Sequence, residues 1–435
     1  MRVDSRSVDT KMVGNRERFF LTTFFILLKV SDGWSLPDYL PTVRNTNGNY
    51  ERNRLIEQYF HLGVNYTEII AFLLLRHGVR LSLRQLKRIL RSRGLRRRKN
   101  QSRIDRVVNA VDQELQSSGS CIGYRQMHQR LLSDHGIVID RDTVRRIVKG
   151  LDPHGVELRS MKRFRRRRYV VPGPNFIWHV DGYDKLKPYG FCIHGAIDGY
   201  SRRILWLEVG PSNNNPMVTV QYYLDCVRQL GGCPRLVRGD CGTENIHIAA
   251  VQRFLRRHCQ DNLAGKKSFL YGKSVANQRI EAWWAFLRKS NTDWWIRFFK
   301  DLTALGHFDN SNVIHVECLR FCFMSLIQEE LHRVSQHWNL HRIRPSNGET
   351  PAGRPDVLFF LPEELNTTHY KIAADESDLD VAENLCGTRH HPLGCSSLFV
   401  CLAELILEDI DLQLPRNTEE AVNLYLELLH HIDSL

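Results

Sequence analysis

The amino-acid sequence predicts an α/β domain in the middle of the chain, with an all-α region before it and a helical part after it. Two observations predict this order. Short amphipathic patterns fill residues 51–168, and apolar segments of strand length follow Pro172-Gly173-Pro174. Proline and glycine interrupt regular structure, so this tripeptide is an expected domain boundary. The 435 residues are 42% hydrophobic and 25% charged, a composition that supports a buried core without cross-links.

Residues 51–100 contain three short helical patterns, the last of which follows Ser82 and ends at Gly94. Serine is a favoured N-cap and glycine a favoured residue after a helix end, so both limits of this third helix are marked. A capped, basic third helix after two short ones is typical of a helix-turn-helix, and a helical bundle with a charged surface is the alternative. The expected DNA contacts on this helix are Arg84, Lys87, Arg88 and Arg91.

Residues 101–168 form a second region of the same kind, followed by a basic linker. Gly123-Tyr124-Arg125 leads into one short helical pattern, and Asp140–Lys149 forms another with Arg145 and Arg146 on its polar side. This pattern resembles the helix-turn-helix that precedes the catalytic core in bacterial insertion-sequence transposases. The linker contains Arg166 and Arg167, within a cluster that suits phosphate contacts or nuclear import, a solvated charge run being the alternative.

The charge of the chain is unevenly distributed. Residues 1–170 contain 35 Lys and Arg against 16 Asp and Glu, a net charge of +19, whereas the whole chain has +13. A basic front half indicates a polyanionic partner, most simply nucleic acid. Residues 366–435 contain 3 basic and 13 acidic residues, which predicts a separate acidic tail that does not touch DNA.

Residues 1–50 are expected to be a leader segment, either buried or poorly structured. Their apolar run, Phe19–Val30, is too short to span a bilayer, so no membrane partner is expected; a signal-peptide core is the alternative. The 11 cysteines are scattered and odd in number, which favours reduced thiols in the cytosol or nucleus. Cys318 and Cys322, with His307 and His315 upstream, suit a zinc site, but packing inside a helix explains the two cysteines better.

The central domain is predicted from the order of its elements. Three strand patterns lie close enough together to be linked by hairpins, and alternating helices and strands follow them, which fits an α/β fold of RNase H type. Residues 292–340 look helical, and a helical extension is expected at 301–365. The expected strands are 176–180, 191–197, 203–209, 235–238 and 269–271, and the expected helices are 218–230, 245–258 and 276–289.

Three acidic residues of this domain occupy positions suited to phosphodiester chemistry. Asp181 follows an apolar strand start, Asp240 ends a short strand, and Glu281 lies on a helix; 58 and 40 residues separate them. A nucleophile is repelled by a phosphate unless charge is neutralised, which two metal ions about 4 Å apart achieve. Hard ions such as Mg²⁺ take carboxylate oxygens. Any one of these acids alone is more simply a surface charge, so the prediction depends on all three positions together.

Four segments of this domain together resemble the integrase core of retroviruses, retrotransposons and related cut-and-paste elements, over residues 170–300. The resemblance implies DNA binding, strand nicking and strand transfer by direct transesterification. It also implies two Mg²⁺ or Mn²⁺ ions held by Asp181, Asp240 and Glu281, and a homo-oligomer as the working form. The segments are WHVDGY around Asp181, AIDGYSRRILWLEV at 196–209, RGDCGTEN at 238–245 and SVANQRIEAWW at 274–284.

The sequence also departs from that family. The interval before Glu281 is slightly longer than is common in retroviral enzymes, and an N-terminal His-His-Cys-Cys zinc domain is not visible. Asp198 is a rival acid that we interpret as structural, because it starts a hairpin turn. Arg288 and Lys289 are hypothesised to contact DNA-end phosphates, with ordinary solvation as the alternative. The tryptophans are expected to pack in the core rather than stack on bases: Trp283, Trp284, Trp294 and Trp295.

The function predicted from the sequence is DNA integration or transposition by a mobile-element recombinase or its host-retained descendant. An alternative is a domesticated, catalytically silent DNA-binding protein. A third hypothesis is an RNase H-like nuclease that cuts DNA without joining it. The basic clusters predict a nuclear protein, or one that is both cytoplasmic and nuclear.

Overall fold

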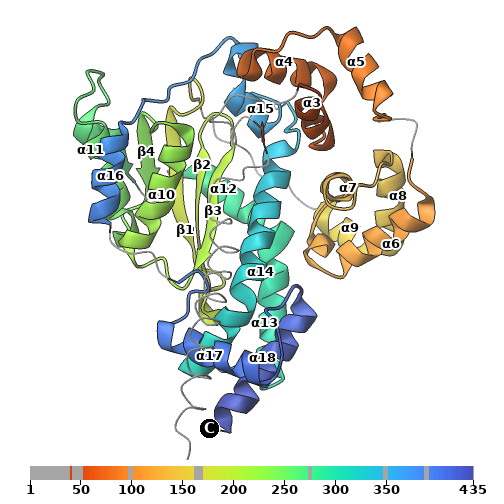
Figure 1. The fold of residues 1–435 in the computed structure, drawn as a ribbon, viewed down its shortest axis with the longest axis vertical. Coiled ribbons are helices and arrows are strands. Elements are labelled where there is room, and N and C mark those ends of the chain that lie inside the picture. Colours follow the sequence, from red (N-terminus) through yellow and green to blue (C-terminus); the bar gives the residue numbers. More distant parts are fainter. Residues whose placement is uncertain are drawn as a thin grey trace, which may run out of the picture.

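The computed structural model describes residues 40–41, 52–96, 101–160, 170–272, 277–345, 351–386 and 391–434. A five-stranded mixed sheet with the order β3-β2-β1-β4-β5 lies in the middle of the molecule (Figure 1). Strands β1, β2 and β3 are antiparallel neighbours, whereas β4 is parallel to β1 and β5 is parallel to β4. The strands are β1 (Ile177–Tyr183), β2 (Cys192–Asp198), β3 (Ile204–Gly210), β4 (Leu236–Gly239) and β5 (Phe269–Tyr271).

All five predicted strands are present, but the first is longer than predicted. The expected strand ended at Val180, whereas β1 continues to Tyr183, because Asp181 pairs with Gly195 and Tyr183 pairs with Ile193 across the β1–β2 ladder. Asp181 therefore lies inside β1, where it is paired with β2. Sequence patterning underestimated the strand because Asp and Gly are uncommon in strands, and tertiary pairing overrides that preference.

Helices cover both faces of the sheet. On one face lie α10 (Pro216–Leu230) and α11 (Ile246–Leu255), and Trp178 of β1 packs there against Tyr223 and Trp206 (Figure 1). On the other face, α12 (Gln278–Leu287) packs against β1 and β2. Successive strand residues point to opposite faces, so β1 sends Trp178 and Val180 to the α10 side and Asp181 and Tyr183 to the α12 side.

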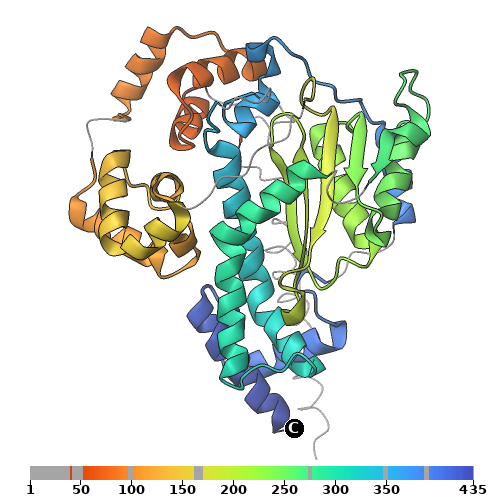
Figure 2. The same ribbon diagram turned by 180° about the vertical axis from the view of Figure 1, so that it is seen from behind.

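The long helix α14 (Val313–Leu340) lies along the outer edge of the sheet, which is formed by β3; Figure 2 shows the same arrangement from behind. Two amide side chains of α14 bond the strand backbone: Gln328 accepts from the Val209 N–H at 2.9 Å, and Asn339 accepts from the Ile204 N–H at 2.8 Å. The same amides donate to carbonyl oxygens of β3. A helix thus satisfies an edge that would otherwise be open to pairing with another strand.

The helical pattern predicted over 292–340 is divided into two helices. Helix α13 (Asp293–Ala304) follows α12 through a π-helical turn, Arg288–Thr292, and ends before Gly306, which has a φ of +76°. A positive φ ends an α-helix and is easily adopted by glycine. The chain turns here, and α14 then runs back along the sheet.

The N-terminal region consists of two helical units with separate small cores. Ser82 caps α5 as predicted, its side chain accepting from the Gln85 N–H, and Asp140 caps α8 in the same way through Thr143. The first unit contains α3 (Arg52–His61), α4 (Tyr66–His77) and α5 (Leu83–Ser92). The second contains α6 (Ile104–Leu115), α7 (Tyr124–Ser133), α8 (Arg141–Leu151) and α9 (Pro153–Ser160).

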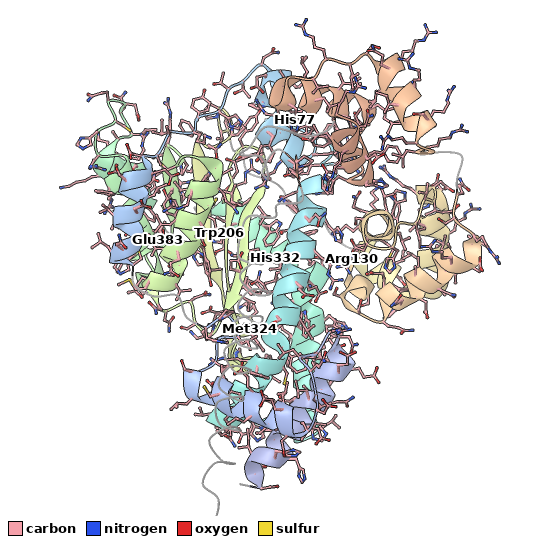
Figure 3. The ribbon with its side chains drawn as sticks, in the orientation of Figure 1. His77, Arg130, Trp206, Met324, His332 and Glu383 are labelled. Carbon is pink, nitrogen blue, oxygen red and sulfur yellow. The ribbon has the colours of Figure 1, made fainter. Side chains whose placement is uncertain are left out.

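Polar contacts join both units to the rest of the molecule. In the second unit, Ser118 hydrogen-bonds Glu330 of α14, and Asp134 pairs with His337 of α14 at 3.0 Å. Figure 3 labels Arg130, which bonds Ser118 at this junction. In the first unit, Arg76 donates to the Phe360 carbonyl oxygen at 2.6 Å. The first unit also has an apolar junction, because Leu361 is buried in its core cluster and Val357 and Phe360 pack against that cluster.

The acidic segment 366–435 is divided between two places. Helix α16 (Glu376–Leu385) packs on α10, where Arg228 pairs with Glu376, Asp380 and Glu383. Helices α17 (Ser397–Asp409) and α18 (Thr418–Asp433) join the other core cluster beside α13 and α14. The first part of this segment therefore packs on the α/β domain, and most of its acidic side chains form ion pairs with Arg228 and Arg257.

Several sequence predictions fall outside the described residues: the leader run Phe19–Val30, and Arg166 and Arg167 of the basic linker. No described helix combines the length and apolar character needed to cross a membrane. Cys318 and Cys322 are buried in the apolar core of α14, which confirms the packing interpretation.

One buried ion pair ties α15 (Pro355–Phe360) to β3. Arg203 donates to Asp356 at 2.8 Å, both side chains are at most 2% exposed, and the guanidinium lies over the rings of Phe359 and Phe360. We expect Asp356→Ala to lower the free energy of unfolding by about 3–5 kcal/mol, because it leaves a buried cation unpaired. Denaturant unfolding of the full chain measures this. Asp378→Ala, which breaks the exposed pair with Arg257, is the control and should cost at most about 1 kcal/mol; equal effects would contradict the prediction.

A second prediction concerns Glu114 of α6, which bonds Arg130 at 2.8 Å and His135 at 2.9 Å. Burial opposes ionisation of Glu114, but the charge of Arg130 and these hydrogen bonds outweigh it and hold its pKa below the ordinary value of 4.5. A lowered acid pKa stabilises the folded state above 4.5 and loses that effect as pH falls through the lowered pKa.

We therefore expect Glu114→Gln to be less stable than the parent chain at neutral pH, and the difference to shrink in acid. Denaturant unfolding at both pH values measures it. Asp105→Asn removes an exposed pair with Arg103 in the same helix and serves as the control. A Glu114→Gln deficit of the same size at both pH values would refute the linkage.

Candidate active site

The sheet brings two of the three predicted acids to one edge. Strands β1 and β4 are parallel neighbours, with Trp178 in register with Val237. Asp181 lies near the carboxyl end of β1, and Asp240 follows β4 directly. Glu281 lies in the first turn of α12, which packs against β1. The carboxyl ends of parallel strands meet at the same edge, so two residues with 58 others between them become neighbours.

Asp181 is the most perturbed of the three acids. Burial raises its pKa to about 7, and the negative charges of Glu281 and Asp240 contribute to the same shift, while a hydrogen bond from Trp284 opposes it. The Trp284 indole N–H donates to Asp181 Oδ2 at 2.8 Å. The three carboxyls therefore lie within electrostatic range of one another, and Asp181 carries the cost of their shared negative charge.

Asp240 is held by the loop that follows it. Its Oδ1 accepts from the Gly242 N–H at 3.2 Å and from Asn245 Nδ2 at 2.9 Å. Glu244 lies beside it, and burial followed by the charge of Asp240 raises the pKa of Glu244. An added Cβ at position 242 would lie 2.2 Å from the Glu244 carboxylate oxygens, so any residue other than glycine would displace the Glu244 side chain. The DCGTEN segment thus builds a turn that aims Asp240.

Glu281 depends on the anchoring of its helix. Asn277, the residue before α12, donates to the Val180 carbonyl oxygen at 2.8 Å and is hydrogen-bonded to His179 Nδ1 at 2.6 Å. Burial lowers the pKa of His179 to about 3, so the imidazole is neutral at this junction. The start of α12 is thereby tied to the two residues that precede Asp181. Burial, and then Asp240, raise the pKa of Glu281.

The donor set suits a divalent cation, although the acids do not converge on one point. Within the described ranges, no three His, Cys, Asp or Glu side chains gather closely enough to hold a metal ion. Asp181 and Asp240 nevertheless lie at the ends of adjacent parallel strands, and α12, which contains Glu281, packs against β1. Three carboxylates repel one another, and their hard oxygens are the ligands that Mg²⁺ and Mn²⁺ take. A cation would relieve the same repulsion that raises the Asp181 pKa.

The rival acid Asp198 has a structural role, as predicted. It is buried, its Oδ1 accepts from the Asn175 N–H at 2.8 Å, and its Oδ2 accepts from the N–H and hydroxyl of Ser201. These bonds close the β2–β3 turn. Both oxygens are thus bonded to the β2–β3 turn and to the turn residue Asn175, which precedes β1.

The predicted DNA contacts lie mostly at the surface. The α5 residues Arg84, Lys87, Arg88 and Arg91 are all exposed on one side of a helix that buries Leu86 and Leu90. Arg145 and Arg146 are exposed on α8. Lys289 is exposed, whereas Arg288 is partly engaged, since its Nε lies 3.0 Å from Asp293. None of these positions touches the three acids, so they constitute separate surfaces.

The tryptophans pack as predicted, and two of them also donate hydrogen bonds, Trp284 to Asp181 and Trp295 to Glu330. Trp283, Trp284 and Trp295 are buried in one apolar cluster, and Trp294 packs against it. The bonds from Trp284 to Asp181 and from Asn245 to Asp240 were not predicted from the sequence. Available signals were the position of Trp284 one helical turn after Glu281, and Asn245 at the end of the DCGTEN turn.

Comparison with known proteins agrees with this geometry. The model of a protein family described as Integrase core domain matches residues 168–358. The match spans the sheet, the three acids and α14, and it supports a retroviral-type integrase catalytic core in this part of the chain. The five-stranded mixed sheet flanked by helices fits an α/β core of RNase H type. No curated protein matches the chain.

Proposed function

We propose that this chain performs metal-dependent DNA nicking and strand transfer, as a DNA-integrating or transposing enzyme. The observation that supports this most directly is the placement of Asp181 and Asp240 at one edge of the sheet, with Glu281 on the helix that packs against β1, inside the segment that matches an integrase core. Acids brought together at such a cost to one of them mark a functional site more often than a structural one.

The roles of the residues follow from their positions. Asp181, Asp240 and Glu281 would hold two Mg²⁺ or Mn²⁺ ions, which supply charge neutralisation and activation of the attacking oxygen when bound. Asn245 and the Gly242 N–H orient the Asp240 carboxylate. Asn277 fixes the start of the helix that contains Glu281. Strands and an anchored helix are rigid supports, which the alignment of attacking and leaving oxygens requires.

DNA would be bound mainly by the N-terminal units. We propose that they are helix-turn-helix units whose basic helices α5 and α8 contact DNA, supported by their exposed arginines and lysines and by their separate cores. The net charge of +19 in residues 1–170 favours the same partner. We further propose that the chain acts as a homo-oligomer in the nucleus, in line with its resemblance to multimeric recombinases and its basic clusters.

Catalysis is tested by Asp240→Asn in the full chain. We expect joining of a labelled oligonucleotide into plasmid to fall by about a hundredfold or more with Mg²⁺ or Mn²⁺, because a cation ligand is lost, while DNA affinity stays unchanged. Glu329→Gln, an exposed acid of α14, is the charge-matched control and should remain active. Persistent joining by Asp240→Asn would refute the assignment. Nicking without joining by the parent chain would indicate a nuclease, and binding alone would indicate a silent DNA-binding protein.

DNA binding by α5 is tested by the salt dependence of affinity. A phosphate contact releases counterions, so Arg88→Ala should weaken duplex binding and reduce the slope of log affinity against log salt by about one. Fluorescence anisotropy over a salt series measures it. Arg257→Ala is the matched control, since Arg257 is already paired with Asp378 on α16. An unchanged slope in Arg88→Ala would rule out a phosphate contact at this position.

A further inference from the structure

Trp284 bonds one of the three acids of the candidate site and lies on the same helix as another. Its N–H donates to Asp181 Oδ2 at 2.8 Å, and it lies on α12 three residues after Glu281. The side chain is 5% exposed. A single residue therefore links the carboxylate of β1 to the helix that presents Glu281.

Packing fixes the direction of this N–H. The Trp284 ring lies 5.2 Å from the ring of Tyr183 and 5.4 Å from that of Trp283, measured between centroids. Its far edge lies under β2, where the Cβ of any residue other than glycine at position 195 would come within 2.9 Å of Trp284 Cη2. A ring enclosed on both sides has little freedom to rotate, so its donor stays aimed at Asp181.

Such a donor has a definite physical effect on a cation ligand. A hydrogen bond to one oxygen restricts rotation of the carboxylate and stabilises its ionised form, which is the form that binds a cation. Here the carboxylate that accepts this bond is only 8% exposed and lies within the β1–β2 ladder, so the indole N–H fixes the direction in which it faces. Without the donor, Asp181 could turn away from Glu281 and Asp240 and so escape their charges.

We infer that Trp284 is a positioning residue that orients Asp181 for divalent cation binding and sets its distance from Glu281. The inference rests on the proposed function. It assigns to Trp284 a role beyond the apolar packing that its neighbours share. The adjacent Trp283 provides the contrast, because it is 1% exposed in the same cluster and its Nε1 has no hydrogen-bond partner in the part of the chain that the structure describes.

The experiment is calorimetric titration of the full chain with Mn²⁺ in the absence of DNA. We expect Trp284→Phe, which keeps an aromatic ring but lacks the donor, to bind Mn²⁺ about tenfold or more weakly than the parent chain. Trp294→Phe removes an indole that packs on Trp295 and Phe298 at the same core and is not one of the two rings that enclose Trp284, so it should leave the affinity unchanged. In strand-transfer assays, Trp284→Phe should raise the Mn²⁺ concentration needed for half-maximal rate more than it lowers the maximal rate.

Each outcome decides a different point. Equal Mn²⁺ affinities for Trp284→Phe and Trp294→Phe, with Asp181→Asn clearly weakened, would overturn the positioning role and leave the proposed site intact. Mn²⁺ binding by Asp181→Asn at the parent affinity would overturn the proposed cation site itself.

Gly195→Ala tests the same inference if Trp284→Phe fails to fold, as judged by circular dichroism. It retains the indole donor but displaces the ring, so Mn²⁺ affinity should again fall by about tenfold or more. A Gly195→Ala chain that binds Mn²⁺ as tightly as the parent would contradict the need for an aimed donor.

Discussion

The parallel pairing of β1 with β4 is the constraint on which the candidate site depends. It is the point where the sheet changes from antiparallel to parallel, and it alone brings Asp181 and Asp240 to one edge. Main-chain hydrogen bonds fix this pairing, while side chains only adjust it. The negative charge gathered there disfavours the folded state, so the surrounding core must supply the compensating stability.

Buried amide side chains contribute hydrogen bonds to this surrounding structure. Gln328 and Asn339 hold α14 against β3, and Asn277 holds α12 against β1. An amide can donate and accept at once, so it can replace a strand neighbour or close a helix start where a carboxylate would add more charge. The helices around the sheet are thereby fixed in register as well as packed, which keeps Glu281 at a constant place relative to the strands.

Charge is sorted in space as well as along the chain. Basic residues remain exposed on α5 and α8, whereas Arg228 and Arg257 of the central domain are covered by acids of α16. The acidic segment neutralises one face of the domain and leaves the N-terminal units as the strongly basic surfaces. A polyanion would then meet its attractive surface away from α16, which favours one orientation on the molecule.

Local pattern and turn chemistry were sufficient to predict the element order, the capped helix that follows Ser82, the three acids as candidates and the structural role of Asp198. The tertiary structure decided the length of β1, the division of 292–340 into two helices and the bond from Trp284 to Asp181. These features arise between segments far apart in the chain. Local preference cannot encode them, since pairing and burial of distant residues outweigh it.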